Sequence, residues 1–481
     1  MSRPEQVHDV IQAVLDGPRG PRIGAFFDLD GTLVEGYTAG VIYADRIKRG
    51  DIGAREFLHT LFAAVDAAFG GDWAKLGDVS VAGLRGQSED FMLELGERQF
   101  VQKIAGTIRP QARDLVRAHL RMGHTVAVAS SATRFQIEPV ARDLGIPNVL
   151  CTQVEVVNGL LTGELDGPML WGEPKAAAAR MFARRNKVDL KASHGYANGA
   201  EDVPFLSSVG HPNALNPHPG LADAARAQGW PILNLRPRPK AGLRAYLGTA
   251  AAVTGLNIGM GFGIAVGALN RDAQFGRNIG FPMACDAALA LAGVKLDVTG
   301  EENLWNARPA VFVGNHQSSL DGIVVGSLLR RDFTAVAKKE ARYDPRILIG
   351  GVLIDPAYID RSNSESAKKD LGALVERIKG GMSVAIMPEG TRTATPQLQR
   401  FKKGGFHLAM QAGVPIVPIV LRNAGELMWR RSMIINPGTV QVAVLDPIPT
   451  VNWSADTIDV HVEQVRKLFA TTLDTWPGGA R

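Results

Sequence analysis

The feature that most constrains the fold is a run of 25 residues without a formal charge, residues 246–270. A helix of that length is long enough to cross the hydrocarbon core of a bilayer. Gly259, Gly263 and Gly267 recur in it at a spacing of four, which allows a second helix to pack closely. A basic, proline-containing segment, residues 235–240, precedes the run and is expected to be stiff and extended. This segment therefore indicates a domain boundary.

The amino-terminal half contains a short apolar run, residues 23–27, that leads directly into Asp28 and Asp30. Such a run predicts a buried strand. In an open parallel sheet, ligands bind at the carboxyl ends of the strands, where paired acids beside a glycine suit magnesium and a phosphoryl group. On these residues alone, an acidic turn between a strand and a helix is the alternative.

Three further segments weaken that alternative. Residues 125–129 predict another strand, which ends at Ser130, and Lys175 opens an alanine-rich helical segment. Asn198 and Asp202 lie in a later polar loop. This order resembles the phosphoserine-phosphatase-like branch of the haloacid dehalogenase superfamily over about residues 20–235, with a helical cap at about residues 37–111.

The resemblance implies a role for each matching residue. Asp28 is the nucleophile that forms an aspartyl-phosphate, and Asp30 is the acid/base that protonates the leaving group and activates water. Ser130 and Lys175 hold the phosphoryl oxygens. Asn198 stands where the family usually has an aspartate, so this half is expected to be either a slow phosphatase or a catalytically idle module. The implied magnesium ligands are Asp28, Asp30, Asn198 and Asp202.

In the carboxyl-terminal half, an apolar run at residues 310–313 leads into His316, and Asp321 opens a helical segment. Histidine takes a proton near neutral pH, and a carboxylate can fix its tautomer and stabilise the imidazolium. This spacing alone is a weak signal, because His218 and Asp223 repeat it. The alternative is a polar residue that ends a strand and an acid favoured by the helix dipole.

Downstream motifs favour the catalytic interpretation. The chain reads, in order, NHQSSLD from Asn315, YIDR, PEGTR, FKKG and VPIVPI. This order resembles the 1-acylglycerol-3-phosphate acyltransferase family over about residues 240–470. The resemblance implies acyl transfer from acyl-CoA or acyl-carrier protein to lysophosphatidic acid, which gives phosphatidic acid without a cofactor. His316 would act as the general base and Asp321 as its partner.

The same resemblance implies the substrate-binding residues. Cations are expected on the substrate phosphate, Glu389 holds the arginines and their loop, and backbone amides at the Gly390 turn are candidate oxyanion donors. Ser318 and Ser319 lack a Gly-x-Ser-x-Gly elbow, so they are expected to cap the helix and not to act as nucleophiles. The predicted substrate-binding set is Arg361, Glu389, Gly390, Thr391, Arg392 and Lys402.

The membrane interpretation follows from topology. A second apolar stretch, residues 278–293, contains Pro282 and Asp286 and is short for a return span. We therefore expect a helical pair that dips into one leaflet from the cytoplasmic face, monotopic or peripheral, with arginines and lysines near anionic lipids. A single span and a buried core helix are the alternatives. Nucleic acid is not an expected partner, because no basic stripe is interleaved with aromatic residues.

Together these features predict an α/β chain. Residues 1–235 form a Rossmann-like parallel sheet with a helical cap, residues 236–295 a linker and membrane-associating helices, and residues 296–481 an α/β glycerolipid acyltransferase domain. The predicted function is membrane-associated acyl transfer in phospholipid biosynthesis, and a second, phosphatase activity, which would make the chain bifunctional, stays open. The alternatives are a membrane-tethered, magnesium-dependent phosphomonoesterase and a non-enzymatic lipid-binding scaffold.

Overall fold

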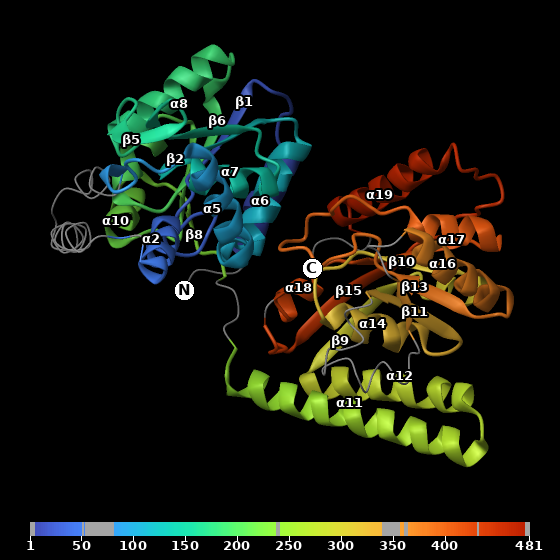
Figure 1. The fold of residues 1–481 in the computed structure, drawn as a ribbon. Coiled ribbons are helices and arrows are strands. Elements are labelled where there is room, and N and C mark those ends of the chain that lie inside the picture. The colour runs from blue at the N-terminus through green and yellow to red at the C-terminus, as the bar shows by residue number, and fades with distance from the viewer. Residues whose placement is uncertain are drawn as a thin grey trace. The chain divides into compact units, whose positions relative to one another are not determined.

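The structure is a computed structural model that describes residues 5–50, 52, 81–236, 241–338, 356–359, 364–430 and 432–476. The chain divides into two compact units, Met1–Arg238 and Pro239–Arg481. Each unit is built on its own sheet (Figure 1).

The first unit contains a six-stranded sheet in the order β3-β2-β1-β6-β7-β8, in which neighbouring strands are parallel. All five residues of the central strand β1 are buried, because helices cover both faces of the sheet. The strands are β1 (Ile23–Phe27), β2 (Thr125–Thr133), β3 (Asn148–Thr152), β6 (Asp189–Ala197), β7 (His211–Leu215) and β8 (Ile232–Leu233).

Alanine-rich and short helices pack on one face of this sheet, where Ala176, Phe205 and Leu221 join a core cluster with Phe26. These helices are α8 (Glu173–Arg185), α9 (Val203–Leu206) and α10 (Pro219–Gln228), with the 3₁₀ turn η2 (Ala200–Asp202). The remaining helices outside the cap are α1 (Glu5–Asp16), α6 (Pro110–Arg121) and α7 (Arg134–Leu144).

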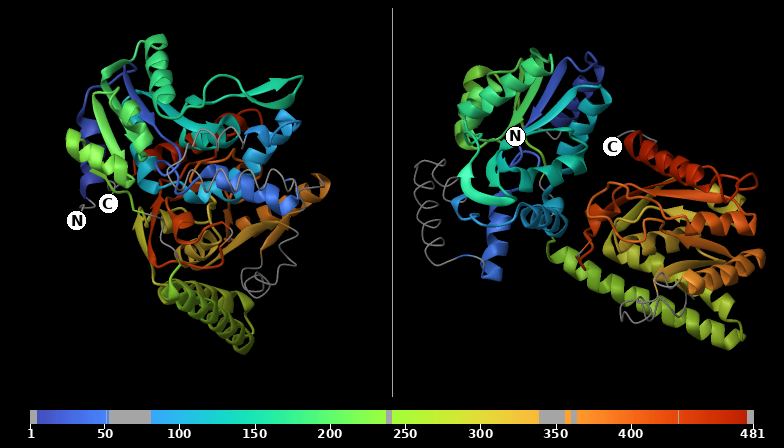
Figure 2. Two further views of the ribbon diagram at one scale, coloured as in Figure 1. Left: turned by 90° about the vertical axis from the view of Figure 1, so that its left-hand side faces the viewer. Right: turned by 45° about the horizontal axis from the view of Figure 1, so that its top comes forward.

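The described part of the cap contains α2 (Thr38–Arg49), α5 (Glu89–Gln102) and η1 (Ile104–Thr107). It is joined by an antiparallel hairpin of β4 (Val154–Val157) and β5 (Leu160–Leu165), which projects from the unit in Figure 2. Asn158 and Gly159 have φ angles of 53° and 77°, as a two-residue hairpin turn requires. The sequence analysis did not predict this hairpin.

The second unit contains a seven-stranded sheet in the order β12-β11-β13-β10-β14-β15-β9. Within it, β14 and β15 are antiparallel, and the other pairs are parallel. The strands are β9 (Val294–Thr299), β10 (Val311–Gly314), β11 (Phe333–Lys338), β12 (Ala357–Ile359), β13 (Ser383–Ile386), β14 (Ile416–Leu421) and β15 (Gly438–Val444).

Two core clusters lie on the two faces of this sheet. One contains Leu289, Phe312 and Val324, and the other contains Val313, Phe406 and Phe469. The first face is covered by α12 (Ala273–Ala292), α14 (Leu320–Leu329) and α18 (Ala424–Leu427), and the second by α16 (Ser364–Lys379), α17 (Gly404–Ala412) and α19 (Ile458–Asp474). A short helix, α13 (Asn303–Asn306), precedes β10.

The uncharged run forms most of α11 (Leu243–Asn270), which lies antiparallel beside α12 (Figure 1). Helix α12 packs on α14, and its Phe281 contacts Phe333 with ring centroids 5.9 Å apart. Helix α11 keeps large apolar side chains exposed, among them Leu247 and Ile258 at 62% and 67%. By length and composition α11 could cross a membrane, although core helices pass the same test.

Glycines allow the two helices of this hairpin to approach closely. A Cβ atom on Gly263 would lie 2.7 Å from the Cα of Gly280 and 2.9 Å from the carbonyl oxygen of Gly276. Gly261 lies two residues earlier in α11, and a Cβ atom on it would meet nothing within 4 Å. The spacing of four seen in the sequence therefore has a packing role at Gly263.

Replacing Gly263 by alanine is expected to destabilise the protein by about 1–3 kcal/mol, because the new methyl group must push backbone away. Replacing Gly261 by alanine is expected to stabilise it by about 0.5–1 kcal/mol, because alanine favours a helix. Thermal unfolding of both full-length variants in mild detergent gives the comparison. Equal effects of the two substitutions would contradict the packing seen at Gly263.

The predicted fold class is confirmed: an α/β unit with a parallel sheet and a helical cap precedes a second α/β unit. The second apolar stretch was expected to be short, but it forms most of α12, a helix of 20 residues with Pro282 inside it.

Candidate active sites

The first candidate site lies at the turn between β10 and α14. Strand β10 is fully buried, and it pairs with β13 on one side and β14 on the other, which fixes where it ends. His316 follows that end, and Asp321 lies in the first turn of α14, where the helix dipole favours an acid. A parallel strand therefore delivers the histidine to the edge of the sheet where ligands usually bind.

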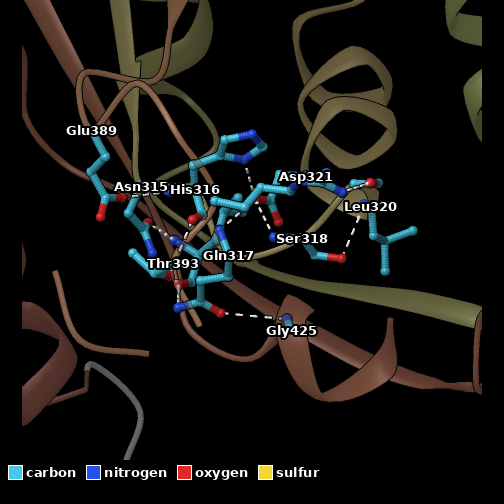
Figure 3. Close-up of polar contacts among 12 residues, drawn as sticks. Asn315, His316, Gln317, Ser318, Leu320, Asp321, Glu389, Thr393 and Gly425 are labelled. Carbon is cyan, nitrogen blue, oxygen red and sulfur yellow. Dashed lines mark hydrogen bonds and ion pairs between the residues drawn. The ribbon is translucent and has the colours of Figure 1, made fainter. Parts of the chain in front are cut away.

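His316 and Asp321 form a close pair (Figure 3). The distance from His316 Nδ1 to Asp321 Oδ2 is 2.8 Å. The same carboxylate oxygen accepts the backbone N–H groups of Gln317 at 2.7 Å and Ser318 at 2.8 Å. Asp321 is fully buried, whereas the His316 side chain is 27% exposed. When His316 donates its Nδ1 proton to Asp321, the opposite nitrogen, Nε2, is left as the basic atom.

Two amides tether this turn to the end of β14. Asn315 donates from Nδ2 to the Leu421 carbonyl at 2.8 Å and accepts the Leu421 N–H at 2.7 Å. Gln317 donates to the same carbonyl at 3.1 Å and accepts the Gly425 N–H at 3.4 Å. Both side chains are buried. The turn that carries His316 is therefore bonded to a neighbouring strand as well as to its own helix.

Glu389 holds the turn from the other side. Its Oε1 accepts the His316 N–H at 2.7 Å and its Oε2 accepts the Gln399 N–H at 2.8 Å. Burial raises the pKa of Glu389 to about 7. Thr393 adds a bond from its N–H to the His316 carbonyl at 2.8 Å. Glu389 thus bonds the loop to this turn through backbone groups of His316 and Gln399, and its expected hold on the arginines stays a prediction.

The remaining predicted residues of this half lie around the same turn or outside the described residues. Arg392 donates to the Ser319 hydroxyl, and Lys402 is exposed, with its N–H bonded to the Pro388 carbonyl at 2.9 Å. Thr391 is exposed on the same loop. Arg361 lies outside the described residues.

The Gly390 N–H donates to the Met387 carbonyl at 3.1 Å, so the prediction of oxyanion donors stays with the other backbone amides of this turn. The expectation for Ser319 needs correction. Ser319 precedes α14 without a side-chain capping bond, and its hydroxyl accepts from Arg392. Ser318 does accept the Leu320 N–H at 3.1 Å, and it donates to the Met428 carbonyl at 2.6 Å. Neither serine hydroxyl contacts His316 among the described bonds.

The second candidate site lies at the carboxyl ends of the strands in the first unit. Lys175, at the start of α8, is buried and donates from Nζ to Asp28 and to Asp202, at 2.7 Å each. Burial alone would lower the pKa of Lys175, but the facing carboxylates of Asp202 and Asp28 raise it. The lysine therefore stays charged, and a phosphoryl group beside Asp28 would meet a fixed cation.

Asp30 is turned towards the cap. Its carboxylate accepts the Thr38 N–H at 2.9 Å and the Thr38 hydroxyl at 3.2 Å, at the first residue of α2. Burial raises the pKa of Asp30 to about 7, with the charge of Asp28 adding to the effect. An acid with that pKa can carry a proton at neutral pH and give it to a leaving group.

A cavity of about 340 Å³ brings the predicted residues of this half together. Asp28, Asp30, Ser130 and Lys175 line it, and so do both residues of the later loop, Asn198 and Asp202. Ser130 is buried, and its hydroxyl accepts the Ala132 N–H at 3.2 Å. The cavity therefore joins segments that are separated by more than 170 residues in the chain.

The oxygen donors here are two carboxylates, Asp28 and Asp202, and the amide of Asn198. Thr32 lies between Asp28 and Asn198, and its single hydroxyl proton is shared between the Asp28 carboxylate at 3.0 Å and the Asn198 amide oxygen at 3.4 Å. Oxygen donors suit magnesium, so these residues fit it in kind, with one neutral donor in place of a charged one. Among the described residues, no three His, Cys, Asp or Glu side chains form a ligand group, and the Asp30 carboxylate is bonded to Thr38 instead.

The two amide tethers, Asn315 and Gln317, were not predicted from the sequence, and neither was the apolar wall of the cavity, which includes Met92 and Trp171. The tethers lie inside the motif that begins at Asn315, so their position was a usable signal. The residues of the apolar wall lie in no recognised motif, because they come from the cap and from the loop after β5.

Comparisons with known proteins agree with this division. A family model described as haloacid dehalogenase-like hydrolase matches residues 25–207, and an acyltransferase family model matches residues 295–422. Phosphoserine phosphatase SerB1 of Mycobacterium tuberculosis is 34% identical over 234 residues, which are 48% of this chain and 75% of that protein.

For the other half, the 1-acyl-sn-glycerol-3-phosphate acyltransferase of Saccharomyces cerevisiae is 36% identical over 186 residues. The match covers 38% of this chain and spans 61% of the length of that relative. The crystal structure of the 1-acyl-sn-glycerophosphate acyltransferase PlsC from Thermotoga maritima matches 49% of this chain and 97% of its own, with 22% identity and a TM-score of 0.43.

Proposed function

We propose that the carboxyl-terminal half acylates 1-acylglycerol-3-phosphate to give phosphatidic acid, because it carries an acyltransferase domain. Through its amino-terminal half, the chain belongs to the haloacid dehalogenase-like hydrolases. The acyl donor is a thioester, acyl-CoA or acyl-carrier protein. The observation that carries the proposal is the buried Asp321 carboxylate, which holds His316 at 2.8 Å.

In the proposed reaction, His316 Nε2 removes the proton from the free hydroxyl of the acceptor. The hydroxyl oxygen attacks the thioester carbonyl, so a C–O bond forms and the C–S bond breaks. The proton then passes from His316 to the leaving sulfur, which departs as a thiol. Asp321 stabilises the imidazolium between these steps, and its two backbone N–H donors keep it in place. No covalent enzyme intermediate is required.

The acceptor phosphate needs cations, and Arg392 is proposed to supply one because it lies on the loop bonded to the His316 turn. Lys402 and Arg361 are the other proposed cations. Arginine offers a planar fork that suits a phosphate.

Replacing Arg392 by glutamine is expected to raise KM for lysophosphatidic acid by about tenfold or more, because a hydrogen bond between charged groups is lost. KM for the acyl donor should not change. Initial rates with each substrate varied in turn provide the measurement. Arg466, which pairs with Glu463 on α19, is the matched control, and its glutamine variant should resemble the native protein. A rise in both KM values would argue against a role on the acceptor phosphate.

We place this activity at a membrane surface. The exposed apolar face of α11 is the support, since Leu247, Ile258 and Leu269 are all more than half exposed. Because the proposed acyl donor is cytosolic, the helical pair is proposed to enter one leaflet from the cytoplasmic face, with Arg244, Arg271 and other basic residues near anionic headgroups.

A second activity is favoured by the buried Asp28–Lys175–Asp202 cluster. We propose that Asp28 attacks the phosphorus of a phosphate monoester while Asp30 protonates the departing alcohol oxygen. Asp30 then takes a proton from water, which hydrolyses the aspartyl-phosphate and releases inorganic phosphate. Asp28, Asn198 and Asp202 would hold magnesium, which, when bound, offsets the negative charge of the phosphate.

Replacing Asn198 by aspartate is expected to lower the magnesium concentration needed for half-maximal phosphate release by about tenfold, because a charged ligand replaces a neutral one. Phosphate release from full-length protein over a magnesium titration measures the change. Asn186, an exposed residue at the end of α8, is the control for the same substitution. Rapid turnover of the native protein at micromolar magnesium would contradict the view that Asn198 weakens the site.

A further inference from the structure

The cavity above Asp28 has two chemically different parts. One part carries the residues proposed for phosphoryl transfer. The other is walled by apolar and aromatic side chains, which include Ile42, Leu84, Met92, Met169, Leu170 and Trp171. A cavity of this size, with a few polar groups at one end and apolar walls, is typical of a small-molecule site.

This apolar wall is part of the packed cap. Ile42, Leu84 and Met92 are 7%, 8% and 2% exposed, and they belong to one core cluster with Phe135 and Leu161. Helices α2 and α5 therefore present their packed side to the cavity. The other side of the wall comes from the loop after β5, which carries Met169 and Trp171.

Charged groups are concentrated at the catalytic end. Among the described lining residues outside that end, Arg46 carries a charge, and it is 5% exposed with its guanidinium bonded to the Gly83 carbonyl at 2.8 Å. A phosphorylated amino acid would need a cation for its carboxylate and an anion for its ammonium group, since burying either without a partner costs several kcal/mol. Glu201 also lines the cavity, but it lies at the catalytic end beside Asp28 and Lys175. Outside that end, the described wall therefore supplies one cation, Arg46, and no anion to pair with an ammonium group.

We propose that the amino-terminal site hydrolyses phosphate monoesters whose alcohol carries an acyl chain, the same chemical class that the carboxyl-terminal half is proposed to acylate. This inference rests on the phosphatase activity proposed above. The P–O bond to the glycerol oxygen breaks, that oxygen takes the Asp30 proton, and water completes the release of phosphate from Asp28. The products are inorganic phosphate and a monoacylglycerol.

The test compares three substrates of the full-length protein at one magnesium concentration, without an acyl donor: hexanoyl lysophosphatidic acid, glycerol 3-phosphate and phosphoserine. Phosphate release is measured. Because each buried methylene is worth about a factor of four in binding, kcat/KM for the hexanoyl ester should exceed that for the other two by about tenfold or more. Faster hydrolysis of phosphoserine would overturn the inference and leave the phosphatase activity standing. No phosphate release from any of the three would refute the phosphatase activity itself.

Two variants test whether the apolar wall produces this preference. Met92→Gln and Trp171→Ala are each expected to lower the ratio of kcat/KM for the hexanoyl ester to that for glycerol 3-phosphate by about tenfold. Met181→Gln is the control, because Met181 is 51% exposed on α8 outside the cavity. Trp171 lies in a loop, so the ratio of kcat/KM values can be measured in Trp171→Ala even if Met92→Gln fails to fold. A native ratio in Trp171→Ala would overturn the inference.

Discussion

Replacing His316 by alanine is expected to slow acyl transfer by about 10²- to 10⁴-fold, because the acceptor hydroxyl loses its positioned base. The effect should appear in kcat, since the proton transfer occurs in the chemical step and not in substrate binding. Thiol release from an acyl-CoA in the presence of lysophosphatidic acid measures it. Asp321 is held by two backbone N–H donors in addition to His316, so the turn should keep its shape in the variant.

The control for this substitution is His218→Ala. His218 and Asp223 repeat the spacing of His316 and Asp321, but they do not form a pair in the structure. His218 precedes α10 in the first unit, and Asp223 pairs with Arg226. The control should therefore retain native acyl transfer. Similar losses in the two variants would show that the dyad is not the origin of the activity.

The second large effect is expected at Asp28. Replacing it by asparagine should abolish phosphate release, because an amide cannot form the aspartyl-phosphate. Lys175 would keep one of its two carboxylate partners, Asp202, so the buried charge would not be left alone. Phosphate release from full-length protein, with the thermal unfolding temperature measured alongside, separates loss of chemistry from loss of folding.

Asp223→Asn is the matched control, because Asp223 is an exposed acid of the same unit whose partner is a neighbouring arginine. It should keep native phosphate release, and acyl transfer should be unchanged in both variants. Substantial phosphate release by Asp28→Asn would mean that another group is the nucleophile, or that the first unit is not a phosphatase of the proposed kind.

Both candidate sites could be located from the sequence because each depends on a local event. A buried apolar strand ends, and the next residues are polar: Asp28 follows β1, and His316 follows β10. Apolar runs and the residues that end them are visible in a single sequence. The parallel sheets then bring such strand ends to one edge, which is why Asp28, after β1, and Asn198, after β6, line one cavity although they lie far apart in the chain.

What could not be predicted depends on pairings between distant segments. The bond from Asn315 to Leu421 spans 106 positions, and nothing in either residue specifies the other. Glu389 was expected to hold the arginines and their loop, and its bond to the His316 N–H, 73 positions away, was not predictable from either residue. The β4–β5 hairpin is different, since Asn158-Gly159 between two apolar segments was a recognisable turn signal that the sequence analysis overlooked.

The measurement that tests the central claim most directly is the dependence of thiol release on the acceptor. Purified full-length protein is mixed with an acyl-CoA, and the free thiol is followed with and without 1-acylglycerol-3-phosphate. Acyl transfer by His316 and Asp321 predicts that the thiol appears only when the acceptor is present, in a one-to-one ratio with phosphatidic acid. Thiol release at the same rate without the acceptor, or none with it, would contradict the account.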